Sequence, residues 1–146
     1  MEPVVHTLVV PASRDRVWSL WTTGVGLAAW LGEGAQVEPW LGGAFTPGAS
    51  AAEVAAGVPP AGPTPVGRIV AIDRPRLVLV EWAPGAVSEE AVAETRVEVR
   101  PDLDGARLTV THHGWGQGQL GADQRAACEA AWLEALRRLR VAALGE

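Results

Sequence analysis

The sequence predicts an α+β fold in which one long C-terminal helix packs against an antiparallel sheet of six or seven strands. Residues from about Ala122 to Leu144 contain no Gly or Pro, and their apolar side chains recur at helical spacing. The segments before this helix are short, rich in β-branched residues and separated by turn residues, which is typical of antiparallel strands. A long helix with one apolar face must bury that face, and the predicted sheet offers the surface for it.

The N-terminal segment is predicted to form a strand followed by two short helices. Val4–Val10 is apolar and rich in β-branched residues, as a strand requires. Ser13 is placed to cap a first helix over Arg14–Trp21, and Asp15 in its first turn complements the helix dipole. A second short helix is predicted over Leu27–Leu31.

The remaining strands are predicted in two groups. Gln36–Trp40 and Ala44–Thr46 flank a Gly-Gly pair and are expected to form a hairpin. The segment Pro47–Pro65 is rich in Ala, Pro and Gly and is predicted to be a loop. Four further strands are predicted over Gly67–Asp73, Leu77–Trp82, Ala93–Arg100 and Arg107–His113. In the third of these, apolar residues alternate with charged ones, which indicates that one face of the sheet is solvated.

The C-terminal helix is predicted to bury one stripe of side chains. The members of this stripe are Cys128, Trp132, Ala135, Leu136, Leu139 and Ala143. Their spacing covers about six helical turns, so this element is expected to supply a large part of the core.

Length and composition favour one folded domain over residues 1–146. The chain is 48% hydrophobic and 20% charged, as in globular proteins. Its formal net charge of −5 and the lack of a basic patch argue against nucleic acid as a partner. No segment reads as a signal peptide, and none approaches the roughly 18 apolar residues of a membrane span. We therefore expect a cytoplasmic protein without a membrane partner.

Several chemistries are excluded by residue type. All twelve basic residues are Arg and there is no Tyr, so a lysine Schiff base and a tyrosine acid are ruled out. With Cys128 as the single cysteine, no intramolecular disulfide can form. His112 and His113 are neighbours on a predicted strand and point to opposite faces, so they cannot readily bind one metal. No phosphate-binding loop or dinucleotide motif is present, and no cofactor or metal is expected.

Motifs along nearly the whole chain resemble one known group of proteins. In chain order they are Val10-Pro11-Ala12-Ser13 with Val17-Trp18, Trp30-Leu31-Gly32, Gly42-Gly43-Ala44-Phe45, Gly67–Asp73 with Pro75 and Trp82, Thr111-His112-His113-Gly114-Trp115, and Trp132 with Leu136 and Leu139. This order and spacing resemble the START-like or SRPBCC superfamily, and its branch of activators of heat-shock-protein-90 ATPase most of all. Ala131 departs from the family pattern, which usually has Gly before the helix Trp.

The resemblance implies a helix-grip fold, in which a curved antiparallel sheet surrounds the long C-terminal helix. It further implies a space between sheet and helix that binds a hydrophobic small molecule without catalysis. The residues expected to line or gate that site are Val78, Val80, Trp82, His112, His113, Trp115, Trp132 and Leu136. Trp82 is expected to be either core or cavity wall, and Trp115 either a lid or a loop anchor.

Two other functions remain open at this stage. A co-chaperone-like interaction module would use its surface to bind a chaperone or another protein, or a second copy of the chain. An enzyme related to cyclases or hydrolases of hydrophobic substrates would need convergent polar groups, for which Arg68, His112 and His113 are the candidates. Because a histidine at a strand end is more often structural than catalytic, we expect a binding protein rather than an enzyme.

Overall fold

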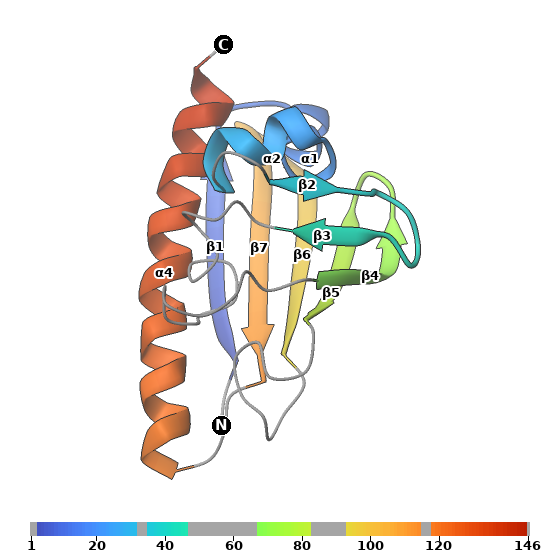
Figure 1. Cartoon of the computed structure of the whole chain (residues 1–146). Helices are drawn as coiled ribbons and strands as arrows, with labels where there is room; N and C mark the ends of the chain where they lie inside the picture. Colours follow the sequence, from blue (N-terminus) through green and yellow to red (C-terminus); the bar gives the residue numbers. More distant parts are fainter. Residues whose placement is uncertain (1–2, 32–34, 47–66, 83–92, 115–117, 146) are drawn as a thin grey trace.

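The chain folds into a seven-stranded antiparallel sheet that curls around one long helix, α4 (Gly118–Leu144). The computed structural model describes residues 3–31, 35–46, 67–82, 93–114 and 118–145. Figure 1 shows α4 lying along β1 (Val4–Val10) at one side of the sheet, with two short helices near its C-terminal end. The predicted α+β helix-grip fold is confirmed.

The sheet has the strand order β1-β7-β6-β5-β4-β3-β2. The other strands are β2 (Gln36–Val37), β3 (Ala44–Thr46), β4 (Gly67–Asp73), β5 (Leu77–Trp82), β6 (Glu94–Asp102) and β7 (Gly105–His113). Four strands, β1, β3, β4 and β5, have the predicted bounds. The last two are longer than predicted because the β6–β7 hairpin keeps pairing up to Asp102 and Gly105. The first strand, β1, pairs with the last, β7, so the strands nearest to the two ends of the chain are neighbours in the sheet.

The predicted strand Gln36–Trp40 was too long, because pairing stops after Val37. The Trp40 N–H donates to Glu38 O, which turns the chain, and Pro39 has no N–H to offer a neighbouring strand. The hairpin is then closed by Gly42, whose φ of 84° favours glycine. Its N–H donates to Ile69 O at 2.8 Å, which joins the turn to β4.

Two capping residues position the short helices α1 (Arg14–Thr22) and α2 (Gly24–Leu31). As predicted, Ser13 Oγ accepts a hydrogen bond from the Arg16 N–H. Thr23 Oγ1 accepts in the same way from the Gly26 N–H, which lets α2 begin three residues before the predicted Leu27. A Cβ on Gly26 would lie 2.4 Å from Ser19 O, so the close approach of α1 and α2 needs glycine here.

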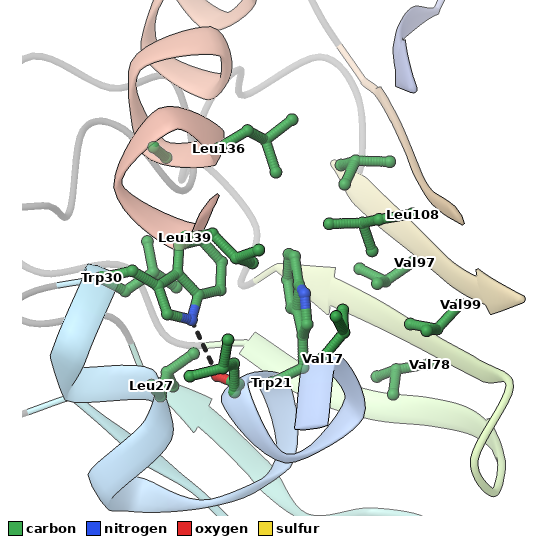
Figure 2. Close-up of a cluster of buried hydrophobic side chains, with 14 of the residues drawn as sticks. Val17, Trp21, Leu27, Trp30, Val78, Val97, Val99, Leu108, Leu136 and Leu139 are labelled. Carbon is green, nitrogen blue, oxygen red and sulfur yellow. Dashed lines mark hydrogen bonds between the residues drawn. The ribbon is translucent and has the colours of Figure 1, made fainter. Parts of the chain in front are cut away.

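The core lies between the inner face of the sheet and α4. The predicted stripe of α4 is confirmed for Trp132, Ala135, Leu136, Leu139 and Ala143, all of which are buried. Figure 2 shows Leu136 and Leu139 facing Val97 and Leu108 of the sheet, with Trp21 beside them. The loop predicted over Pro47–Pro65 and the side chain of Cys128 lie outside the described part of the chain. Among the described helices, none is long and apolar enough to cross a membrane.

Neighbouring positions on α4 allow a matched test of this packing. Trp132 is 0% exposed and Leu133 is 45% exposed. Trp132→Ala should lower the free energy of unfolding by about 3–5 kcal/mol, because it leaves a large cavity. The control Leu133→Ala should cost less than about 1 kcal/mol. Chemical denaturation of both variants measures the difference, and equal losses would contradict the packing described.

Candidate ligand-binding site

A line of three hydrogen-bonded side chains crosses the inner face of the sheet. Trp82 Nε1 donates to Thr95 Oγ1 at 2.9 Å, and Thr95 Oγ1 lies 2.6 Å from His112 Nδ1. These residues belong to the adjacent strands β5, β6 and β7, and strand register places Thr95 directly opposite His112. All three are at most 1% exposed. We refer to them as the polar line.

The threonine hydroxyl is well suited to the centre of this line, because it has one proton and two lone pairs. It accepts the indole proton of Trp82. With the imidazole proton on Nε2, the hydroxyl donates its own proton to His112 Nδ1. Since buried polar groups are costly without partners, this arrangement is what allows a polar pair within an apolar face.

Burial fixes the charge state of His112. Desolvation, with a smaller contribution from repulsion by His113, lowers the pKa of His112 from 6.5 to about 3. The imidazole is therefore neutral at neutral pH. A base with so low a pKa has little driving force to abstract a proton, so the site is poorly suited to acid–base catalysis.

Aromatic rings form the wall that faces the polar line. The rings of Trp21 and Trp132 stack with centroids 6.0 Å apart, and Trp132 lies 6.2 Å from the His112 ring. Trp30 meets Trp21 edge-on at 4.5 Å and donates from Nε1 to Leu20 O at 2.8 Å. Phe45 also stacks with Trp21, with ring centroids 6.3 Å apart.

Two indole N–H groups in this wall have no hydrogen-bond acceptor among the residues that the structure describes. They are Nε1 of Trp21 and Nε1 of Trp132, and both side chains are at most 1% exposed. Leaving a buried donor unsatisfied costs about 1–3 kcal/mol. The wall thus contains two buried polar donors, and the ring that carries one of them, Trp132, lies 6.2 Å from that of His112.

The structure brings together most of the residues that the sequence nominates. Six of them are each at most 3% exposed: on the inner face of the sheet lie Val78, Val80, Trp82 and His112, and on α4 lie Trp132 and Leu136. His113 is separated from them, because it lies on the outer face, where Nε2 is 3.0 Å from Glu94 Oε1. Trp115 lies outside the described residues. Arg68 is exposed on the outer face, so it does not converge with His112 as the enzyme alternative required.

Sequence reasoning missed the role of Thr95, Trp21 and Trp30. Thr95 shares the inward positions of β6 with Val97 and Val99. A polar residue within an apolar alternation was the available signal. Its partner is 17 residues away, however, and only the pairing register shows that the two meet.

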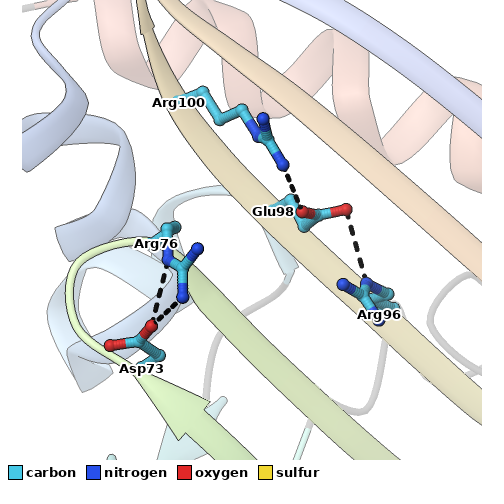
Figure 3. A network of polar contacts seen from close by, with 5 residues as sticks. All are labelled: Asp73, Arg76, Arg96, Glu98 and Arg100. Atoms are coloured by element: carbon cyan, nitrogen blue, oxygen red, sulfur yellow. Dashed lines mark hydrogen bonds and ion pairs between the residues drawn. The ribbon is translucent and has the colours of Figure 1, made fainter.

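The outer face of the sheet is charged and solvated, as predicted. Figure 3 shows Glu98 between Arg96 and Arg100, at 3.3 Å and 3.2 Å. Hydrogen bonding from Arg100 is the main cause that lowers the pKa of Glu98. Asp73 and Arg76 form a second ion pair, at the β4–β5 turn. Such exposed pairs contribute little to stability, and they offer no enclosed site.

Among the described residues, no group of three or more His, Cys, Asp and Glu side chains is placed to hold a metal ion.

The neutral state of His112 predicts a pH-dependent stability. Between about pH 6.5 and 3, the unfolded chain binds a proton at this imidazole and the folded chain does not. The free energy of unfolding should therefore fall by about 1.4 kcal/mol for each pH unit as the pH is lowered through this window. Denaturation from about pH 7 to 4.5 measures this slope before most carboxylates titrate.

Two variants separate the contribution of His112 from the rest. His112→Asn should flatten the slope, whereas His113→Gln, on the outer face, should largely keep it. A wild-type slope no steeper than that of His112→Asn would mean that the folded protein accepts the proton.

Comparisons with known proteins agree with this architecture. Residues 11–143 match the family model described as activator of Hsp90 ATPase homolog 1-like protein. A comparison with curated proteins gave no match. Protein BH1534 of Bacillus halodurans has a similar fold, with a TM-score of 0.75 and 19% identity over 98% of this chain and 97% of that one.

Two further solved structures share the fold. The Aha1 dimer from Colwellia psychrerythraea gives a TM-score of 0.74 and 16% identity, over 100% of this chain and 99% of that one. DynU16, described as a putative protein in the dynemicin biosynthetic locus, gives 0.72 and 18%, over 100% of this chain and 49% of that one. Because the family model spans most of the chain, this protein belongs to the activator of Hsp90 ATPase homolog 1-like family of START-like proteins.

Proposed function

We propose that this protein binds a small hydrophobic molecule with a hydrogen-bond acceptor, between the inner face of the sheet and α4. The observation that carries this proposal is the pair of buried indole donors, Trp21 Nε1 and Trp132 Nε1, without acceptors among the described residues. A ligand carbonyl or hydroxyl oxygen beside these rings would accept one or both protons. The apolar side chains around them would contact the rest of the molecule.

Tryptophan at positions 21 and 132 supports recognition of a ligand as well as packing of the core. Phe at position 21 or 132 would fill much of the same space without an unsatisfied N–H, and would spare the desolvation cost. Trp82 and Trp30 show the contrast, because both of their indole donors have acceptors within the protein. Buried polar groups that lack hydrogen-bond partners within the protein are a common feature of binding sites.

The chemistry of the buried polar side chains supports binding without catalysis. Of the buried polar or charged side chains that the structure describes, Thr22, Thr95 and His112, only His112 titrates in an accessible range. Its pKa of about 3 makes it a weak base at neutral pH. We therefore assign the polar line to orienting the ligand. The position of DynU16 in a biosynthetic locus is in keeping with a small-molecule ligand.

A pair of compounds of similar shape tests this proposal. 2-Acetylnaphthalene carries a carbonyl acceptor, and 2-ethylnaphthalene has no acceptor. We expect both to quench tryptophan fluorescence, with the acetyl compound binding about tenfold more tightly because it satisfies a buried donor. The indole N–H resonances of Trp21 and Trp132 should shift in ¹⁵N NMR spectra during the titration.

Tryptophan variants test which side chains cause the preference for the acetyl compound. Trp132→Phe removes one of the two N–H groups and keeps an aromatic ring, so it should weaken the preference for the acetyl compound, and the double variant with Trp21→Phe should abolish it. Trp40→Phe is the matched control, because Trp40 is exposed at the β2–β3 hairpin. Equal affinities for the two compounds in the wild-type protein, or no saturable binding of either, would refute the proposed site.

A further inference from the structure

The helix α4 carries a second stripe of side chains that the sheet does not cover. Leu133, Arg137, Val141 and Leu144 follow one another at intervals of three or four residues, so they lie on one face of the helix. Val141 is 71% exposed and Leu144 is 50% exposed. A helix that needed only its inner face would carry polar residues at these positions.

Beside this outer stripe, α1, α2 and α4 enclose a groove of about 740 Å³. Leu20 of α1 and Val25 of α2 form apolar parts of its lining, and Val141 of α4 forms another. Val25 is 89% exposed, so this apolar surface faces solvent. Gly26 allows the close approach of α1 and α2 at this groove, since a Cβ there would lie 2.4 Å from Ser19 O.

The groove is positively charged in a chain whose net charge is −5. Its lining contains Arg16, Arg137 and Arg138, with Glu134 as the one acidic residue. Arg16 donates to Ala142 O and Ala143 O, and Arg138 donates to Trp30 O, so both hold the ends of helices. Arg137 forms an exposed ion pair with Glu134 at 3.6 Å, and its side chain is 68% exposed.

We propose that this groove docks an acidic, amphipathic helical segment of a partner protein. Leu133–Leu144 spans about 17 Å, which matches about three turns of a docked helix. Apolar residues at helical spacing on the partner would contact Val25, Val141 and Leu144, as in other helix-in-groove complexes. Carboxylates flanking them would meet Arg137 and Arg138.

The size of the surface favours a protein segment over a small ligand. Leu133 and Leu144 do not line the groove, yet both are exposed and continue its apolar surface along α4. A small molecule within the groove would leave these two side chains in water. A helical segment lying along α4 would cover them.

The test uses a synthetic peptide of 18 residues, fluorescently labelled, with Leu at positions i, i+3, i+4 and i+7 and Glu at its other helical positions. We expect saturable binding in fluorescence anisotropy, which weakens as salt is raised because the charges are exposed. The double variant Arg137→Glu with Val141→Asp should lower the affinity at least tenfold. Both positions are exposed, so the fold should persist, and a thermal melt checks this.

Controls define what would overturn the proposal. Leu103→Asp introduces a charge at a fully exposed leucine of the β6–β7 turn, away from the groove, and should leave binding unchanged. Equal binding of a peptide with Lys in place of Glu would refute charge complementarity. A concentration-dependent dimer in sedimentation that Val141→Asp abolishes would identify a second copy as the occupant instead, a state described for the Colwellia relative. Either result, or no binding of the peptide, rejects the acidic segment and leaves the ligand site between sheet and helix unaffected.

Discussion

Burial of Trp132, Leu136 and Leu139 on one face of α4 is the constraint on which the rest of the structure depends. The helix is 27 residues long, and its buried apolar face, from Trp132 to Ala143, needs the inner face of the sheet to cover it. Inward side chains of the curled antiparallel sheet, such as Val97 and Leu108, belong to the same core as this face of the helix (Figure 2). The rows they form, such as Val80, Thr95 and His112, come from strict alternation along each strand.

The same burial explains why each polar group in the core needs a hydrogen-bond partner. Once α4 closes the inner face, every donor on it must find a partner inside the protein or remain unsatisfied. Thr95 solves this for Trp82 and His112 at once. Trp21 and Trp132 have no such neighbour among the described residues. The core therefore combines the hydrogen-bonded polar line with two indole donors that have no acceptor among the described residues.

Much of the fold could be predicted from the sequence, because its signals are local. Alternation in Leu77–Trp82 and the helical spacing around Trp132 each follow from a few neighbouring residues. The start of α2 was missed, since it depends on the hydroxyl of Thr23 rather than on hydrophobic spacing.

The site was harder to predict than the elements that form it. Val80, Trp82 and Trp132 could be nominated from their faces alone. The contact between Thr95 and His112, by contrast, requires the register of two strands, which no local pattern supplies. The separation of His113 from the site does follow from strand geometry, because adjacent residues point to opposite faces.

The attachments of α4 also limit what could bind beneath it. Arg16 ties the last carbonyls of α4 to α1, and Arg138 ties α4 to the end of α2 at Trp30. Trp30 in turn contacts Trp21 and donates to Leu20, so the short helices, the long helix and the aromatic wall are joined by direct contacts. A ligand that lifted the C-terminal half of α4 from the sheet would have to break these buried or half-buried hydrogen bonds, each with its own cost. Under the proposed function, the ligand is therefore one that fits beside Trp132 while α4 keeps its attachments.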